Sequence, residues 1–271
     1  MKWKSFKHRF VPWVAANWST RLVRSVDSHS LIEKQFEALS QLKPQLETLS
    51  LILKPLTPLA FKSNLSDTNQ LKYQTLCSSA VKSLFDINNF TLHVSPSLQA
   101  EGLGVFVNQG RVKESQLVAL YPGTIYLPLQ PILLQSLHNS YILRCVDGIH
   151  IDGRHTHLSR LIYRSCAFRD VNSSSQLTSD LSWLSLQPLN PLSIGQLVNN
   201  QSREIQPNVE YIELDVPGSM VDEYGYLLPN CCYGPRLDAK DASRRVVALM
   251  ATRDITQGEE IYSSYFTIAT K

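Results

Sequence analysis

The stretch GEEIYSSYF, residues 258–266, brings carboxylate and phenol groups together near the end of the chain. A turn glycine is followed by two acids, Glu259 and Glu260, and then by two tyrosines, Tyr262 and Tyr265. A late tyrosine here could simply pack in a last strand. It could also be a catalytic phenol at a point where other segments and a cofactor meet. The residues by themselves leave both interpretations open.

A glycine pair lies much earlier, in EGLGVFV at residues 101–107. Gly102 and Gly104 favour a tight turn before a strand, and glycine also lets another group approach the backbone closely. A glycine pair as short as this is weak evidence for a binding site. Taken alone, it indicates a turn more than a site.

Two further motifs lie between these stretches, YPG at 121–123 and GQLVNN at 195–200. Tyr121 ends a strand pattern, and Pro122 fixes the backbone angle φ of the turn that follows. The paired asparagines Asn199 and Asn200 are a common turn signal. The order of the four motifs along the chain is more informative than any one of them.

The five cysteines of the chain indicate a reducing compartment. Their number is odd, no two form a C-x-x-C pair, and no histidine stands at ligand spacing from them, so we expect no structural zinc. They are Cys77, Cys145, Cys166, Cys231 and Cys232.

The net charge of +3 is too small to indicate nucleic-acid binding, but residues 1–26 hold six Lys or Arg and no acid. With its aromatic residues, this start could bind a membrane surface or nucleic acid, serve as a mitochondrial presequence, or pack onto the domain. No apolar run approaches the ~18 residues of a transmembrane helix. We expect a nuclear or cytoplasmic protein, with mitochondrial import as the minority alternative.

Residues 1–88 form a helical N-terminal region in the predicted organisation. Apolar residues recur near the helical period in LIEKQFEALSQLKPQLETLSLIL, and Pro44 breaks or kinks this pattern. A second helix follows SNLSD, with Ser66 or Asp67 as its cap. The two apolar faces are expected to contain Ile32, Phe36, Leu39, Leu46, Leu49 and Leu53 in the first helix and Leu76, Ala80 and Leu84 in the second.

Residues 89–271 form a mainly β domain in the same prediction, because short apolar runs alternate with Gly, Pro, Asn and Asp. Two insertions interrupt it, at about 154–194 and about 217–245. The first is made basic by Arg160, Arg164 and Arg169, has a serine-rich middle and is expected to be a solvated surface loop, and the second an irregular loop. The predicted strands are FTLHV, GVFV, QLVALY, GTIYL, YILRCV, GIHI, VEYIELDV and VVALMATR.

In their order, the four motifs resemble those of the SET-domain protein lysine methyltransferases. That family has a G-x-G turn before a GVF-type strand, then Y-x-G, then N-H-S-C-x-P-N, and finally A-x-R-D-I-x-x-G-E-E-L-x-Y-x-Y. The resemblance covers about residues 90–266, and its most specific part is ALMATRDITQGEEIYSSY. KHRFVPWVAAN, YPGTIY and NPLSIGQLVNN narrow the resemblance to the SET domain-containing protein nine group.

The resemblance implies methyl transfer from S-adenosyl-L-methionine to a lysine side chain of a protein or peptide, with nucleic acid not the substrate. Such a site must hold the amine neutral, although the pKa of free lysine is about 10.4. Most of the rate then comes from aligning the amine nitrogen with the methyl carbon. The implied fold is a β-clip of small twisted sheets whose C-terminal segment threads beneath the loop that carries Asn199.

The resemblance also assigns roles to individual residues. Tyr265 takes the place of the catalytic tyrosine, and Tyr121 and Tyr262 would line the substrate channel. The residues that would bind the cofactor are Gly102, Leu103, Gly104, Asn199, Asn200 and Tyr265.

The chain departs from the family pattern in three places. Asn200 replaces the histidine of N-H-S, and Ser263 replaces the tyrosine that precedes the catalytic one. Only five residues follow Phe266, so the helices before residue 88 or the segment 154–194 would have to close the site in place of a cysteine-rich tail. The alternative function is therefore a SET-fold binding module with weak or no turnover.

Overall fold

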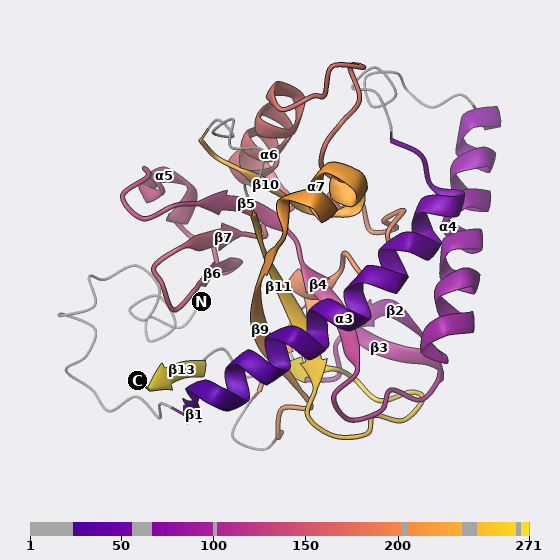
Figure 1. The fold of residues 1–271 in the computed structure, drawn as a ribbon. Coiled ribbons are helices and arrows are strands. Elements are labelled where there is room, and N and C mark those ends of the chain that lie inside the picture. Colours follow the sequence, from indigo (N-terminus) through magenta and orange to yellow (C-terminus); the bar gives the residue numbers. More distant parts are fainter. Residues whose placement is uncertain are drawn as a thin grey trace.

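The computed structural model of the protein describes residues 24–55, 67–99, 102–201, 205–234, 243–263 and 267–270. Within the described residues, 24–30, 67–69 and 267–270 are described by their backbone alone. Two long helices, α3 (Ser28–Ile52) and α4 (Asp67–Asn88), pack against a set of small β-sheets. In Figure 1, α3 runs diagonally across the strands β9, β11 and β4, with α4 beside it. The two predicted helices are thus present.

The buried face of α3 differs from the predicted one in its first half. Ile32 and Phe36 are 62% and 76% exposed, while Ala38 and Leu42 are fully buried. The buried positions Ala38, Leu42, Leu46, Leu49 and Leu53 follow the spacing of a single helical face. The helical period was therefore predicted correctly, but the apolar face at its start was not.

Pro44 does not break α3, which continues from Ser28 to Ile52. Proline removes the hydrogen bond to the carbonyl four residues earlier, which is that of Ser40. Both Pro44 and Ser40 are exposed, so this carbonyl faces water. The prediction of a break is wrong because the proline lies on the solvent side of the helix.

The largest sheet has five strands in the order β4, β11, β9, β12 and β8. Strand β11 is antiparallel to β4 and β9, whereas β12 is parallel to both β9 and β8. The strands are β4 (Leu117–Tyr121), β8 (Asn199–Asn200), β9 (Val209–Val216), β11 (Arg244–Ala251) and β12 (Tyr262–Ser263).

Three smaller sheets surround this one. The hairpin of β2 (Phe90–Pro96) and β3 (Leu103–Gly110) is antiparallel. A four-stranded sheet has the order β10, β5, β7 and β6, and β1 pairs in parallel with β13. Their strands are β5 (Gly123–Tyr126), β6 (Ile142–Arg144), β7 (His150–Asp152), β10 (Asn230–Cys232), β1 (Arg24–Asp27) and β13 (Thr267–Thr270). Each of the eight predicted strand sequences overlaps an observed strand.

The two insertions are more ordered than predicted. The short helix α5 (Leu133–Ser136) precedes the first insertion, which contains α6 (His157–Arg169), where Tyr163 and Trp183 are buried against each other with ring centroids 4.8 Å apart. The solvated-loop prediction is wrong for this part because α6 buries one face against β5 and β10, while the serine-rich middle at 173–175 is exposed as expected. The second insertion is not an irregular loop, since it holds α7 (Gly218–Tyr224) and β10. The remaining short 3-10 turns are η2 (Ser182–Leu184), η3 (Gly195–Leu197) and η4 (Gly225–Leu227).

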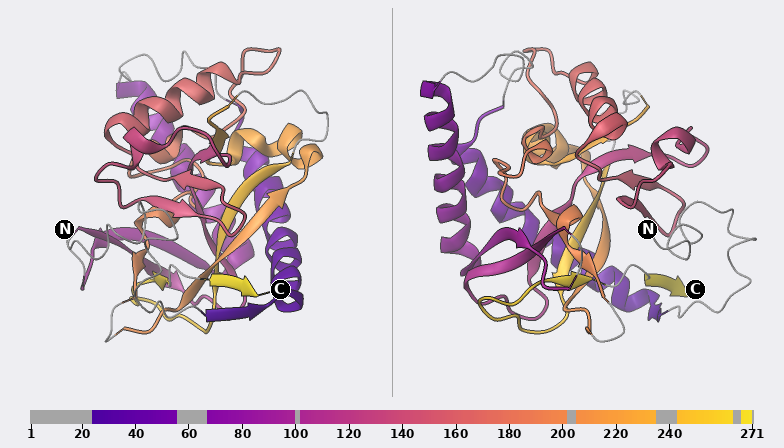
Figure 2. Two further views of the ribbon diagram at one scale, coloured as in Figure 1. Left: turned by 90° about the vertical axis from the view of Figure 1, so that its left-hand side faces the viewer. Right: turned by 180° about the vertical axis from the view of Figure 1, so that it is seen from behind.

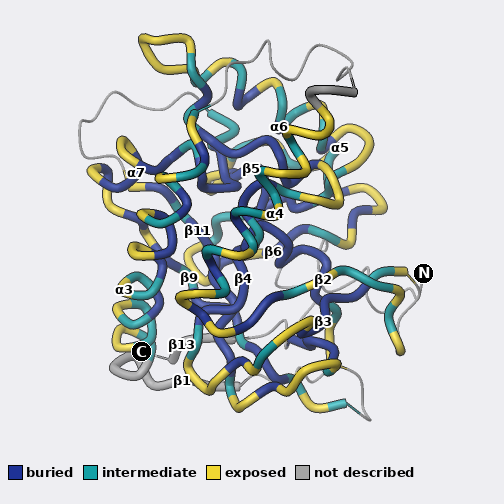
Figure 3. Tube along the Cα trace, turned by 90° about the vertical axis from the view of Figure 1, so that its right-hand side faces the viewer, coloured by how far each residue is buried: buried dark blue, intermediate teal, exposed yellow. Residues whose placement is uncertain are grey.

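The helices and the large sheet share one hydrophobic cluster. Leu42, Leu46 and Leu49 of α3 belong to the same cluster as Leu120 of β4 and Ile212 of β9. Figure 3 shows this burial as a dark band along the sheet strands with exposed segments outside it. The two views in Figure 2 place α6 and α7 toward one end of the molecule and β1 with β13 toward the other. Among the described residues, no helix combines the length and apolar character needed to cross a membrane.

Candidate functional site

Three predicted motifs meet along the segment 258–263, and we call this meeting place the closing seam. On one side, Gly258 and Ile261 donate main-chain hydrogen bonds to Val107 and Val105 of β3, each at 2.8 Å. On the other side, Tyr262 pairs with Asn199. The closing seam therefore consists of residues 97–99, 102–104, 199–201 and 258–263.

The strand order at the closing seam is unusual. Strand β12 lies between β8 and β9, although these two strands are consecutive in the sequence and β12 comes long after both. Gln201 donates to the Ser263 carbonyl and Asn208 to the Tyr262 carbonyl, at 2.8 and 2.9 Å. A strand that enters a sheet between two strands consecutive in the sequence, as β12 does, is rare in proteins. The expectation that the closing segment lies beside the loop carrying Asn199 is confirmed.

Gly102 and Gly104 are required for different reasons. Gly102 has a backbone φ of +104°, which residues other than glycine rarely adopt. A Cβ added at this position would meet nothing within 4 Å. A Cβ on Gly104 would instead overlap the Glu260 carboxylate and lie 3.2 Å from Asn199 Nδ2. The space at Gly102 is open, whereas the space above Gly104 is filled by the protein itself.

The Glu260 carboxylate is the centre of the closing seam. It is 3% exposed, and donors from three separate segments reach it. Ser97 Oγ and Asn199 Nδ2 donate to Oε1 at 2.7 and 3.1 Å. The Leu98 N–H and the Tyr262 hydroxyl donate to Oε2 at 2.9 and 2.5 Å. The buried Glu260 carboxylate thus connects residues 97–98, β8 and β12 through hydrogen bonds.

These hydrogen bonds explain the direction of the pKa shift at Glu260. Burial by itself would raise the pKa of this carboxyl, but the donors from Tyr262, Leu98, Ser97 and Asn199 outweigh it and lower the pKa. The pKa of Tyr262 rises to about 12, because its phenol is desolvated and donates to the carboxylate. Glu260 is therefore ionised and Tyr262 protonated throughout the neutral range.

The two asparagines of the NN motif have different environments. The Asn199 side chain is half-buried and donates from Nδ2 to the Leu103 carbonyl at 3.0 Å as well as to Glu260. Asn200 is exposed, and its backbone pairs with Ser263. The cofactor-binding roles predicted for Gly102, Leu103, Gly104, Asn199 and Asn200 remain predictions, but these residues do lie together.

Asn208, which follows Pro207, holds the closing segment in place. It is 1% exposed. Its Nδ2 donates to the Glu260 carbonyl at 2.9 Å, and its Oδ1 accepts from the Tyr262 N–H at 2.8 Å. Asn208 therefore fixes the backbone between Glu260 and Tyr262 and helps to aim both side chains.

The predicted channel residues are held by other groups of the protein. Tyr262 is 7% exposed and donates to Glu260. Tyr121 is 2% exposed, and its hydroxyl donates to the Tyr141 carbonyl at 2.7 Å. Its ring meets Tyr211 edge-on, with centroids 5.9 Å apart, and Ser263 Oγ donates to the Tyr211 hydroxyl at 3.0 Å. Tyr211 thus connects Tyr121 to the closing seam.

The predicted catalytic residue, Tyr265, lies outside the described residues. Its role therefore remains a prediction.

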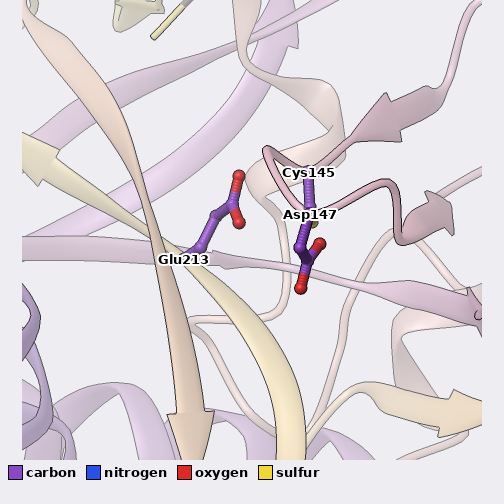
Figure 4. Close-up of side chains that lie close together, drawn as sticks. All are labelled: Cys145, Asp147 and Glu213. Atoms are coloured by element: carbon purple, nitrogen blue, oxygen red, sulfur yellow. The ribbon is translucent and has the colours of Figure 1, made fainter. Parts of the chain in front are cut away.

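A second polar cluster lies on the edge of β9, where Cys145, Asp147 and Glu213 bring potential metal ligands within 4.8 Å of one another. Figure 4 shows Glu213 reaching from its strand toward the turn that carries Cys145 and Asp147. Arg245 binds Asp147 and Glu213 at 2.8 and 3.0 Å. The Val146 N–H also donates to Glu213 at 2.8 Å. The arginine already supplies the positive charge that a metal ion would bring.

The burial of this second cluster has a clear effect on its thiol. Desolvation raises the pKa of Cys145 to about 12, and Glu213 adds to the effect while Arg245 opposes it. A neutral thiol is a poor metal ligand and a poor nucleophile. The arrangement favours a structural ion-pair network at this position.

The sequence of this chain is similar to two known SET-domain proteins. The chain is 36% identical to human "SET domain-containing protein 9" over 295 residues, which covers 98% of this chain and 96% of the relative. It is 44% identical to the Pongo abelii protein of the same name over 172 residues, covering 64% and 62% of the two chains. No family model matches the chain.

Solved SET-domain structures are more distant. The crystal structure of KRYPTONITE in complex with mCHH DNA, an H3(1–15) peptide and SAH is 15% identical, with a TM-score of 0.32. The match covers 65% of this chain and 23% of that one. A TM-score this low carries no argument, so the assignment depends on the two sequence relatives.

The small sheets, the late insertion of β12 and the glycine and asparagine motifs beside it define a SET-domain protein. With 36% identity over nearly the full length of both chains, this chain belongs to the SET domain-containing protein 9 family.

Proposed function

We propose that this protein transfers a methyl group from S-adenosyl-L-methionine to a lysine side chain of a protein or peptide. The observation that supports this most is the convergence of Gly102, Asn199 and the closing segment in one seam. Membership of a SET-domain family adds to it, because the family pattern assigns cofactor binding to the same motifs.

The residues of the closing seam suit this cofactor. Open space and a positive φ at Gly102 leave main-chain groups accessible to a ligand. Asn199 offers a fixed amide next to that turn. S-adenosylmethionine would supply the electrophilic methyl group, and the protein would bind and orient it.

The remaining requirement is a neutral lysine amine in line with the methyl group. Desolvation in a protein channel lowers the pKa of an amine, because burial disfavours the charged form. Alignment at near-attack distance then supplies most of the rate. We assign Tyr265 to this position, where its hydroxyl would orient the amine nitrogen.

The variant Tyr265→Phe tests this assignment because it removes only a hydroxyl group. We expect unchanged binding of S-adenosylhomocysteine and a 10- to 1000-fold or larger loss of turnover, roughly the effect of one well-placed polar group in a transition state. The measurement is transfer of labelled methyl groups to lysine in a protein lysate, followed by identification of methyllysine. Tyr226→Phe is the matched control, because the Tyr226 hydroxyl donates to the Leu53 carbonyl outside the closing seam, and it should keep full activity. Full activity in Tyr265→Phe would show that this phenol only packs.

A second candidate function, a binding module with little turnover, is favoured by one observation. Ser263 stands where the family pattern has a tyrosine, and its hydroxyl is taken up by Tyr211. Such a module would bind the cofactor poorly, so calorimetry with S-adenosylhomocysteine separates the two functions. No heat of binding at millimolar ligand would favour the module.

The location in the cell is proposed from the cysteine pattern. Free cysteines suit a nuclear or cytoplasmic protein. Imaging of a tagged chain in mitochondria would overturn this.

A further inference from the structure

We infer that Glu260 is a positioning residue for the cofactor: its buried carboxylate fixes the orientation of the Asn199 amide, which in turn receives the amino-acid end of the ligand. The inference rests on the proposed function. Glu260 lies in the GEE turn motif, and the family pattern gives it no role in binding. Its position follows from the contacts that it makes in the closing seam.

The first step concerns the two hydrogens of the Asn199 amide. An asparagine side chain has two donors on Nδ2 and one acceptor oxygen. Both acceptors that Nδ2 meets, the Leu103 carbonyl and Glu260 Oε1, lie at 3.0–3.1 Å. Because neither can donate a hydrogen bond in return, the amide cannot be flipped without losing both contacts. The Asn199 oxygen is therefore presented to the opposite side as an acceptor.

The second step concerns the ligand that would meet that oxygen. The amino-acid end of S-adenosylmethionine carries a carboxylate, which has only acceptors, and an ammonium group, which has only donors, and we assign the Asn199 oxygen to the ammonium group. An outward-facing amide oxygen suits it, whereas an outward-facing NH₂ would repel it. A flipped Asn199 would therefore weaken the amino-acid end of the ligand and leave the adenosine end untouched.

The third step concerns what holds Glu260 itself. Its four donors come from Ser97, Leu98, Asn199 and Tyr262, so the carboxylate cannot rotate freely. Gly104 leaves the space into which the carboxylate fits, because any Cβ there would overlap it. The absence of a side chain at Gly104 thus makes room for the Glu260 carboxylate, which in turn holds the Asn199 amide. Direct access for the ligand is the property of Gly102.

The experiment uses the full chain and two ligands that differ only at the amino-acid end. S-adenosylhomocysteine carries that end, and 5′-methylthioadenosine lacks it. Their dissociation constants are measured for the wild-type protein and for Glu260→Gln, together with the thermal unfolding midpoint. Glutamine keeps the shape but can donate to Asn199 Oδ1, so that only the Leu103 carbonyl still favours the present orientation of the amide.

We expect Glu260→Gln to weaken S-adenosylhomocysteine binding by about 10- to 100-fold, in line with loss of a hydrogen bond to a charged group. Binding of 5′-methylthioadenosine should change by less than about twofold. The matched control is Glu47→Gln, since Glu47 is exposed on α3, pairs there with Lys43 and should leave both ligands unaffected. Ser97→Ala removes one donor to Glu260 and should give a smaller loss in the same direction, which keeps the test valid if Glu260→Gln fails to fold.

Two results would overturn the inference while leaving the proposed function intact. Equal weakening of both ligands in the folded variants would mean that Glu260 supports only the fold. Unchanged binding of both would mean that it has no role. If the wild-type protein binds neither ligand, the proposed function fails, and the inference fails with it.

Discussion

Two buried carboxylates, Glu260 in the closing seam and Asp180 in the first insertion, have pKa values shifted in opposite directions. Glu260 is 3% exposed, and its pKa is lowered by four donors. Asp180 is 7% exposed, and its pKa rises to about 6. Desolvation is the largest influence on both groups, so burial alone does not distinguish them.

The difference lies in how many donors each carboxylate meets. Asp180 accepts a main-chain hydrogen bond from Ser182 at 2.7 Å, and the Ser182 and Ser193 hydroxyls lower its pKa only in part. Glu260 has main-chain, hydroxyl and amide donors from separate segments. A buried acid is therefore costly in the insertion and well compensated in the seam. We interpret Glu260, the compensated acid, as the one whose charge serves a purpose, which is to orient the Asn199 amide.

A substitution of Arg245 has the largest expected effect on stability. Here a largely buried cation is surrounded by acids, whereas Glu260 is a buried anion surrounded by donors. The Arg245 guanidinium, 11% exposed, binds Asp147, Glu213 and Asp215. Replacing it with methionine leaves these acids uncompensated, and we expect a loss of about 3 kcal/mol of unfolding free energy at pH 7. Denaturant titration measures the loss.

The pH dependence of Arg245→Met should follow from the acids that it leaves behind. The pKa of Glu213 is already raised by burial, and loss of the arginine would raise it further. The destabilisation relative to wild type should therefore be greatest where Glu213 is ionised and should shrink as falling pH protonates its carboxylate. S-adenosylhomocysteine binding should not change. A loss of ligand affinity in the folded variant would contradict the separation of the two clusters.

Tyr262→Phe has the next largest expected effect and sharpens the role of donors at Glu260. Its hydroxyl donates to Glu260 Oε2 at 2.5 Å, so its removal should cost about 1.5–3 kcal/mol, as for a hydrogen bond to a charged group. The raised pKa of Tyr262 means that its contribution is complete below about pH 10 and lost as pH rises through about 12. Chemical unfolding at pH 7 is the measurement. A cost below 0.5 kcal/mol would show that the other three donors suffice.

Asp180→Asn has the smallest expected effect and the opposite sign. Because the pKa of Asp180 is raised to about 6, its ionised form weakens the folded state above that pH. Asparagine can keep the hydrogen bond from Ser182 and removes the charge, so we expect a gain of about 1–2 kcal/mol at pH 7.5. The gain should disappear below about pH 4, where aspartic acid is also neutral. Equal stability of both proteins at pH 7.5 would contradict the contrast between the two acids.

The strands and the closing segment could be predicted from the sequence because their signals are local. VEYIELDV corresponds to β9, and the pairing of Tyr262 with Asn199 agrees with the expected threading. The pattern did not reveal the exposure of Phe36, since periodicity identifies a helical face but not what covers it.

The role of Glu260 could not be read from the sequence because its partners are distant along the chain. Ser97 is 163 residues away and Asn199 is 61. GEE looks like any acidic turn until the fold brings those donors to it. The same holds for Asp180 and Trp183, whose burial in the insertion depends on packing against α6 and β10.

Hydrogen–deuterium exchange of the full chain with and without S-adenosylhomocysteine tests the central claim most directly, because it reports on the seam and the insertion at once. The ligand should slow amide exchange in peptides covering 97–104 and 199–201, since ligand contacts protect the backbone from opening. Peptides covering 178–192, around Asp180, should be unchanged. Protection at 178–192 with none at the closing seam, or no protection anywhere at saturating ligand, would contradict the account.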